Sequence, residues 1–179
     1  MRKDATSDVS FTCTRFGNVC WSSGSMLPLW TKMVSESGKV YSTGPEMTRF
    51  FMGVDQAIGF LLAVVEADHK VDGKVIVPVM KSASVKAFLS EFCKIHCCDW
   101  ERIEGRAGDK PFERLISEFE ASKTETLALG DAPVFAINYD TIQNPSVQGE
   151  ISSEHSERLD AEEIRSLIHG NIDVARLGI

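Results

Sequence analysis

The spacing of hydrophobic and polar residues changes from a strand period to a helix period early in the chain. Val9, Phe11 and Cys13 alternate with polar residues, which predicts a β-strand with one buried face over residues 9–14. From residue 26 onward, apolar residues recur every three or four positions and stop before Gly38, the usual residue after a helix end. The start of the chain therefore predicts a strand, a loop and a helix.

A second helix is predicted over residues 55–67. Its apolar residues Ile58, Leu61, Leu62 and Val65 have the spacing of one helical face. We expect this face to point into the core.

The other predicted elements follow from short apolar runs and capping residues. They are strands over residues 39–43, 74–78, 100–104 and 133–138, a helix that begins after Ser84, a short helix through Leu115, and a last helix that begins after Asp160 and ends near Gly170. The irregular alternation of strands and helices predicts an α/β fold. We divide the chain into an N-terminal arm (1–8), an α/β domain (9–140) and a C-terminal segment with the final helix (141–179).

Composition excludes several classes of function. Of the 179 residues, 43% are hydrophobic and 25% are charged, as in soluble globular proteins. The net charge of -7 argues against sequence-independent nucleic-acid binding, which needs a positive surface. No signal-peptide pattern follows Met1, and the apolar run at residues 60–65 is too short to span a membrane. We expect a cytoplasmic protein with reduced cysteines.

One cluster of residues raises the question of a metal site. Cys93, His96, Cys97 and Cys98 lie close together in one predicted helix. A structural zinc site needs a second pair of ligands at a distance, and the sequence offers one cluster and no second pair. We therefore favour buried helix cysteines and predict no metal.

Four stretches of the chain, taken in order, resemble one family. They are residues 14–19 with 24–29, residues 45–52, residues 73–78 with 105–113, and residues 151–153 with 158–165. Together they are similar to the UDP-N-acetylglucosamine 4,6-dehydratases and related 4-epimerases of polysaccharide biosynthesis. These enzymes are extended short-chain dehydrogenase/reductases, and the similarity is to their C-terminal, substrate-binding part.

The resemblance implies a UDP-sugar site. Asn18 would contact the diphosphate, Arg49 and Arg106 would close on the phosphates or uridine, and Glu113 would be a polar contact near the nucleoside. Arginine suits this role because its planar guanidinium presents a fork of donors to phosphate oxygens. The chain departs from the family at Ser23, where an arginine is usual, and around residue 112, where a histidine is replaced.

The family's cofactor half has no counterpart in this sequence. No G-x-G-x-x-G pattern follows a predicted strand, and neither Tyr41 nor Tyr139 has a lysine four residues later. We therefore predict no catalytic residues and no cofactor in this chain, with NAD(P) present only if a partner supplies the missing half. The chain alone is not expected to be a working enzyme.

The predicted strand at residues 9–14 would lie inside a larger sheet in the family. By itself it would expose unpaired backbone groups, so we expect a partner to cover it. That partner could be a second copy, a separately encoded cofactor half or an unrelated assembly.

Three functions remain open from the sequence. The chain could be a catalytically incomplete domain used in nucleotide-sugar binding or assembly. It could be the substrate-binding half of a split NAD(P)-dependent dehydratase or epimerase. It could also be a structural or decoration protein of a large assembly such as a virion.

Overall fold

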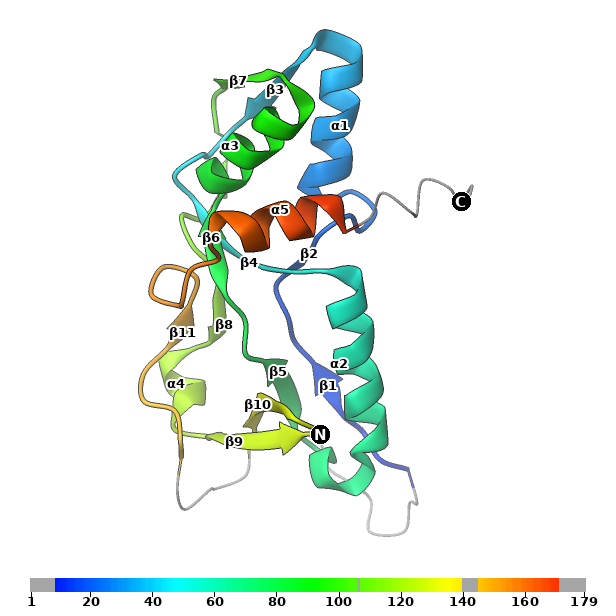
Figure 1. Ribbon diagram of the computed structural model, residues 1–179. Helices are drawn as coiled ribbons and strands as arrows, with labels where there is room; N and C mark the ends of the chain where they lie inside the picture. Colours follow the sequence, from blue (N-terminus) through cyan, green and yellow to red (C-terminus); the bar gives the residue numbers. More distant parts are fainter. Residues whose placement is uncertain (1–8, 106, 140–144, 171–179) are drawn as a thin grey trace.

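The computed structural model describes residues 9–105, 107–139 and 145–170, which form an elongated α/β molecule (Figure 1). The helices are α1 (Met26–Ser37), α2 (Val54–Glu66), α3 (Val85–His96), α4 (Glu118–Ala121), α5 (Ala161–His169) and the 3-10 helix η1 (Asp68–Val71). The strands are β1 (Cys13–Thr14), β2 (Asn18–Val19), β3 (Lys39–Ser42), β4 (Thr48–Met52), β5 (Val75–Pro78), β6 (Ser82–Ser84), β7 (Asp99–Arg102), β8 (Arg114–Ile116), β9 (Thr124–Leu129), β10 (Ala132–Ile137) and β11 (Ile151–Ser152).

A four-stranded sheet with the order β1-β5-β10-β9 forms one end of the molecule. Strand β1 runs parallel to β5, whereas β5, β10 and β9 pair antiparallel. Helix α2 covers this sheet through Phe60 and Val64, which pack in one core cluster with Ile76. The Phe16 and Phe60 rings meet edge to face at 6.1 Å, which fixes the helix against the chain that leaves β1.

The other end of the molecule is mainly helical. Helices α1 and α3 lie beside the parallel pair β3–β7, and α5 packs against α3 (Figure 1). Their shared core contains Leu27, Trp30, Phe88 and Phe92, and the Trp30 and Phe92 rings meet at 5.4 Å. These large apolar side chains hold the three helices together.

Strand β4 joins the two ends. It pairs with β2 on one side and with β6 on the other. Successive side chains of a strand point to opposite faces. Phe50 therefore packs with Ile116 in one core cluster, whereas Phe51 packs with Phe88 in the cluster shared by α1, α3 and α5. Gly17 lies so close to Phe50 that an added Cβ would come within 2.4 Å of the Phe50 Cβ, so only glycine fits there.

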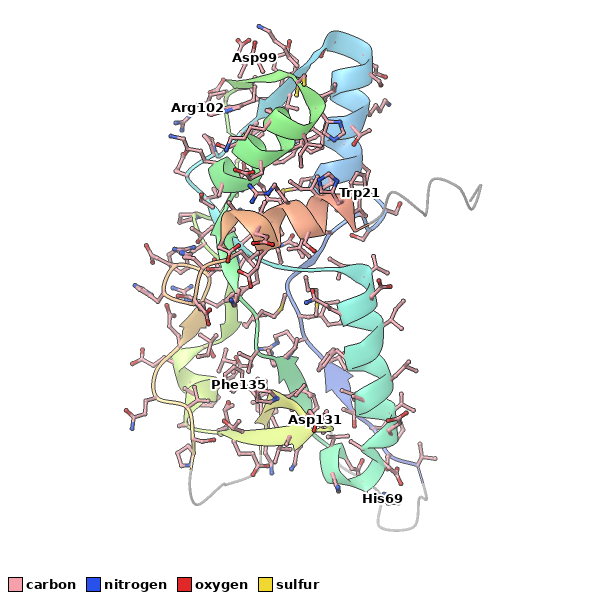
Figure 2. The ribbon with its side chains drawn as sticks, in the orientation of Figure 1. Trp21, His69, Asp99, Arg102, Asp131 and Phe135 are labelled. Carbon is pink, nitrogen blue, oxygen red and sulfur yellow. The ribbon has the colours of Figure 1, made fainter. Side chains whose placement is uncertain are left out.

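Trp21 connects the loop after β2 to the last helix. It has a left-handed backbone (φ 66), which is uncommon for a residue with a side chain. Its indole Nε1–H donates to the carbonyl oxygens of Leu167 (3.2 Å) and Ile168 (3.1 Å) at the end of α5 (Figure 2). The contact satisfies carbonyls that a helix end leaves without an intrahelical donor.

The structure confirms the predicted helix caps. Gly38 ends α1 in the left-handed region (φ 70), and the Ser84 hydroxyl accepts a hydrogen bond from the Ala87 N–H at the start of α3. Asp160 and Glu163 form the predicted reciprocal capping pair of α5. The strands predicted at 39–43, 74–78, 100–104 and 133–138 appear as β3, β5, β7 and β10, with ends that differ by no more than two residues.

The predicted core face of the second helix is wrong. Helix α2 buries Ala57, Phe60 and Val64, whereas Ile58, Leu61, Leu62 and Val65 are between 40% and 74% exposed. The helix carries apolar residues on two adjacent faces, and the sheet covers only one of them.

Two other predictions need correction. The short helix expected through Leu115 is strand β8, which pairs with β11, and the short helix α4 begins only at Glu118. The strand expected over residues 9–14 is limited to Cys13–Thr14. Before it, Phe11 is held by the turn at residues 72–73 rather than by a strand partner, through bonds to the Asp72 side chain and the Gly73 N–H.

A partly buried ion pair ties the end of β1 to α4. Arg15 donates to both carboxylate oxygens of Glu120, at 2.9 and 2.8 Å, and to the Leu115 carbonyl at 2.8 Å. The Tyr139 hydroxyl also donates to Glu120 at 2.7 Å. These donors, led by Arg15, lower the pKa of the Glu120 carboxyl to about 2.

We expect Glu120→Gln to destabilise the fold at pH 7. The loss of a charged acceptor from this network should lower Tm by roughly 4–8 °C, or about 2 kcal/mol. Because the folded pKa of Glu120 is about 2 and its ordinary value is 4.5, this stabilisation is complete above about pH 5 and is lost as the pH falls through those values. The Tm values of the unmodified protein and of Glu120→Gln, measured by thermal melts between pH 7 and pH 2, should therefore converge at the acid end.

Glu118→Gln is the matched control, because Glu118 is an exposed residue of the same helix. It should change Tm by far less at every pH. Equal effects of the two substitutions would contradict the assignment of the stabilisation to the Arg15–Glu120 pair.

Candidate functional site

Strand β4 brings two of the predicted site residues together. Asn18 begins β2, which pairs parallel with β4 so that Asn18 lies opposite Phe51. Arg49 is the second residue of β4 and is partly buried. The strand pairing therefore places an amide and a guanidinium beside each other, although α1 and β3 separate them along the chain.

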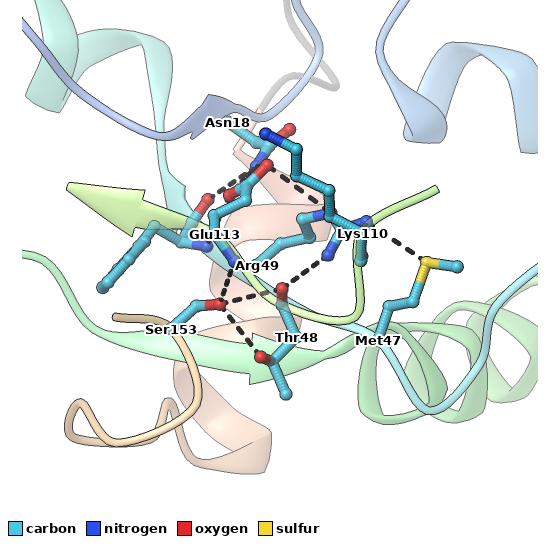
Figure 3. Close-up of polar contacts among 8 residues, drawn as sticks. Asn18, Met47, Thr48, Arg49, Lys110, Glu113 and Ser153 are labelled. Carbon is cyan, nitrogen blue, oxygen red and sulfur yellow. Dashed lines mark hydrogen bonds and ion pairs between the residues drawn. The ribbon is translucent and has the colours of Figure 1, made fainter. Parts of the chain in front are cut away.

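Glu113 links these two side chains from the segment before β8. The Asn18 Nδ2 donates to both Glu113 carboxylate oxygens, at 3.2 and 3.0 Å, and to the Phe50 carbonyl at 3.1 Å (Figure 3). The Arg49 Nε lies 3.5 Å from Glu113 Oε1. Both neighbours of the Asn18 amide nitrogen are acceptors, so the orientation of the amide follows from its surroundings.

Thr48 and Ser153 hold Glu113 in place. The Glu113 N–H donates to the Ser153 hydroxyl at 2.9 Å, and the Ser153 hydroxyl donates to the Thr48 carbonyl at 2.9 Å (Figure 3). Ser153 is completely buried. Sequence reasoning did not select either residue, because a buried serine is recognised as a site component only from its contacts.

Arg49 makes further contacts that orient its guanidinium. It donates to the carbonyl oxygens of Thr48 and Lys110, each at 2.8 Å, and to the Met47 sulfur at 3.2 Å (Figure 3). A thioether is a weak acceptor. The N–H that faces Met47 is therefore the one that a stronger acceptor could take with least loss.

A cavity of about 300 Å³ opens beside these residues. Asn18 and Arg49 line it, together with residues from the start of α1 and from β3 and the turn that follows it. Glu113 is absent from this lining, so among the described residues it supports the wall from behind.

The N-terminus of α1 forms another part of the wall. Ser25, Met26 and Leu27 line the cavity, and the first turn of the helix contains no acidic residue. The Ser25 hydroxyl makes no capping hydrogen bond, and its oxygen is buried without a partner in the described structure. The first N–H groups of a helix have no intrahelical acceptor and carry partial positive charge. This wall therefore favours an anion.

The structure thus brings together three of the four predicted site residues. Asn18, Arg49 and Glu113 contact one another. A contact from the Asn18 amide to a diphosphate would require it to exchange one of its present hydrogen bonds. Arg106 lies outside the described residues.

The prediction of buried helix cysteines holds only for Cys93, because Cys97 is exposed, Cys98 is half-buried and both follow the end of α3. Cys93 is buried, and burial raises its pKa to about 12. The His96 ring lies 4.2 Å from the Phe92 ring, centroid to centroid. Within residues 9–105, 107–139 and 145–170, no group of three or more histidine, cysteine or acidic residues is arranged to hold a metal ion.

Within residues 9–105, 107–139 and 145–170, no helix combines the length and the apolar character needed to cross a bilayer.

Comparisons with known proteins identify the family of the chain. Residues 1–129 match the family model described as "Polysaccharide biosynthesis protein". The UDP-glucose 4-epimerase of Rickettsia bellii is 30% identical over 119 residues, which are 65% of this chain and 34% of that protein. An uncharacterized membrane protein of Methanocaldococcus jannaschii is 32% identical over 127 residues, or 66% of this chain and 38% of its own length.

Solved structures share the fold. The Pen protein of Bacillus thuringiensis covers 93% of this chain with a TM-score of 0.78 and 25% identity, and 51% of its own chain is matched. A UDP-glucuronic acid 4-epimerase of Bacillus cereus covers 56% of this chain with a TM-score of 0.50 and 19% identity, and 34% of that chain is matched. These matches confirm the prediction of an α/β fold that forms part of an extended short-chain dehydrogenase/reductase.

The chain therefore spans only about a third of the curated relatives and about half of the Pen chain. The family model nevertheless covers most of the sequence, and the family matches the one that the four sequence stretches resembled. This chain belongs to the polysaccharide biosynthesis protein family.

Proposed function

We propose that this domain binds a UDP-sugar and holds its diphosphate in the cavity beside Asn18 and Arg49. The observation that carries the proposal is the meeting of a guanidinium and a helix N-terminus at one cavity of about 300 Å³. A diphosphate needs several donors arranged around it, and these two groups supply them from two different elements, β4 and α1.

Arg49 would supply the charged contact. It lines the cavity, and its N–H toward Met47 is directed at a weak acceptor. A phosphate oxygen would accept that hydrogen bond more strongly than a thioether sulfur does. The bonds to the Thr48 and Lys110 carbonyls would keep the guanidinium in position.

Helix α1 would supply backbone donors. Its N-terminus has no acidic side chain to compete with a phosphate, and the Ser25 hydroxyl is not used as a cap. Pro28, in the first turn, has no N–H, so the donors would come from Met26 and Leu27. The positive end of the helix dipole would add a favourable field.

Glu113 and Asn18 would organise the site. Glu113 holds the Asn18 amide and lies beside Arg49, which partly balances its negative charge. In this role, Glu113 would position the residues that face the ligand. The proposed involvement of Arg106 rests on the family resemblance alone.

Relatives support the choice of ligand. Curated relatives in Rickettsia are named UDP-glucose 4-epimerases, and the Bacillus cereus structure of similar fold contains a UDP-4-deoxy-4-fluoro-glucuronic acid and NAD. The same comparisons motivate a second candidate function, in which this domain is the substrate-binding half of an enzyme that another polypeptide completes.

Arg49→Lys should weaken UDP-N-acetylglucosamine binding by about tenfold, because lysine keeps the charge but loses the planar fork. Isothermal titration calorimetry with UDP and UDP-N-acetylglucosamine would measure the change. Arg102→Lys is the matched control, since Arg102 is exposed and pairs with Glu46 outside the cavity lining. Absence of heat from the unmodified protein at millimolar ligand would refute the proposal.

Ser25→Asp should separate helix stability from ligand binding. Aspartate is as good an N-cap as serine, so Tm should be unchanged or higher. Its charge would stand at the cavity wall and should weaken UDP binding by about tenfold. Ser35→Asp adds the same charge in the exposed last part of the same helix and should leave the affinity within about twofold. Equal losses from both substitutions would argue against a diphosphate at the α1 N-terminus.

We also propose that the domain is catalytically incomplete by itself. A tyrosine that removes a proton needs a lowered pKa, whereas the hydrogen bond to Glu120 raises the pKa of Tyr139. Tyr41, the other tyrosine, is followed four residues later by Pro45. Purified protein incubated with UDP-N-acetylglucosamine and NAD or NADP should therefore give no new sugar nucleotide by chromatography, and turnover would overturn this part of the proposal.

A further inference from the structure

A groove of about 1090 Å³ lies between helix α2 and the β9–β10 hairpin and reaches α5. Its lining is largely apolar and includes Phe60 of α2, Val134 of β10 and Leu167 of α5. Two further lining residues mark its extent: Figure 2 shows Trp21 beside α5 and Asp131 at the hairpin. A contiguous apolar surface of this size is typical of a contact site rather than of isolated exposed residues.

Helix α2 presents small residues to this groove. Gly59 and Ala63 lie one helical turn apart, and both line the groove. A Cβ added to Gly59 would meet no other part of the structure within 4 Å, so the helix surface is open there. A glycine inside a helix costs stability but lets another backbone approach closely. The groove is therefore shaped for a polypeptide segment as well as for side chains.

The chain leaves α5 at the wall of this groove. Helix α5 ends at Gly170, whose N–H donates to the Ser166 carbonyl at 2.8 Å. Both residues line the groove. The segment 171–179, which lies outside the described residues, therefore begins at the groove itself.

The sequence of this segment has a strand-like alternation. Ile172 and Val174 are apolar, Asp173 between them is charged, and Arg176 follows two positions after Val174. In an extended chain, alternate residues share one side, so positions 172, 174 and 176 would face the same way. Ala175 would face the opposite side. One side of the segment thus carries two apolar residues followed by a cation.

The length of the segment suits the groove. The part of α2 that lines it begins at Gly53 and ends at Ala63, a rise of about 15 Å at 1.5 Å per residue. Six extended residues, 171–176, span about 20 Å. Arg176 would therefore reach the hairpin end of the groove.

The charges of the groove favour the same register. Asp131 lines the groove and is exposed at the hairpin turn. Lys81 and Glu163, which also line it, are already paired with each other at 2.8 Å. An acidic group thus stands at the end that Arg176 would reach.

We propose that residues 172–176 bind in this groove as an extended segment, with Ile172 and Val174 against its apolar lining and Arg176 beside Asp131. The segment would shield the apolar lining from water, and its backbone would pass over Gly59. Among the described residues, the linings of this groove and of the UDP-sugar cavity share only Cys20 and Phe51. The occupant is therefore separate from the proposed sugar nucleotide.

A segment of the same chain is favoured over a separate peptide. A short covalent connection gives an intramolecular ligand an effective concentration of about millimolar, so weak contacts are enough to fill the site. Here the connection begins at Gly170, which belongs to the groove lining. A separate peptide would have to displace this neighbour.

The test is hydrogen–deuterium exchange of the full 179-residue chain, read by mass spectrometry and corrected for intrinsic rates. Val174→Asp places a charge against the apolar lining and should release the segment. The amides of residues 172–176 should then exchange at least about tenfold faster than in the unmodified protein. Ala175→Asp is the matched control: it adds the same charge on the opposite side, so exchange should stay within about twofold.

A second variant blocks the groove from the side of α2. Gly59→Leu should leave Tm unchanged or higher, because leucine favours a helix and its Cβ has space. Its side chain would occupy the path of the segment, so exchange of residues 172–176 should again rise about tenfold. Glu66→Leu adds the same side chain to an exposed position of α2 outside the groove lining and should change exchange by less than about twofold.

Several results would overturn the proposal. Residues 172–176 that exchange at intrinsic rates in the unmodified protein would show that the groove does not hold them. Equal effects of Val174→Asp and Ala175→Asp, or slow exchange retained in Gly59→Leu, would contradict the extended register. Protection that rises with protein concentration would assign the segment to the groove of a second copy.

Discussion

The passage of β4 between two hydrophobic cores determines how the site is built. Phe50 and Phe51 are adjacent, and the strand pleat sends them into different clusters. The strand cannot shift by one residue without exchanging these rings, so its register is fixed. Gly17 adds a second restraint because its backbone lies against Phe50. With β4 and β2 held in this way, Arg49 and Asn18 cannot move apart without disturbing the cores.

The polar network around Glu113 is placed on that rigid frame. A carboxylate near a proposed diphosphate site would repel the ligand if it faced the cavity directly. Here it stands behind the wall, where it accepts hydrogen bonds from Asn18 and from the Phe50 N–H at 3.3 Å. The Arg49 Nε lies 3.5 Å from this carboxylate. The arrangement uses the negative charge of Glu113 to order the donors of Asn18 and Arg49 from outside the cavity lining, in which Asp109 is the acidic member among the described residues.

Local sequence signals predicted the parts of the fold that depend on local physics. Gly38, Ser84 and the Asp160–Glu163 pair act through contacts within a few residues, so the sequence alone located these helix ends. The apolar stripe of α2 was wrongly assigned to the core, because hydrophobicity does not state which of two apolar faces meets the sheet. Strand β8 was mistaken for a helix because it is three residues long and takes its conformation from β11. Of the site, the family resemblance selected Asn18, Arg49 and Glu113, while Ser153 and the α1 N-terminus required the fold.

The indole of Trp21 has a consequence for communication through the molecule. Its side chain is attached to the final turn of α5, and its backbone lies in the short segment that leads from β2 to α1. A rotation of α5 would therefore pull on the segment that places Ser25 at the cavity. By thermodynamic linkage, a ligand that orders the start of α1 would in turn restrain α5. The position of α5 is thus coupled to the start of α1, although no residue of α5 lines that cavity.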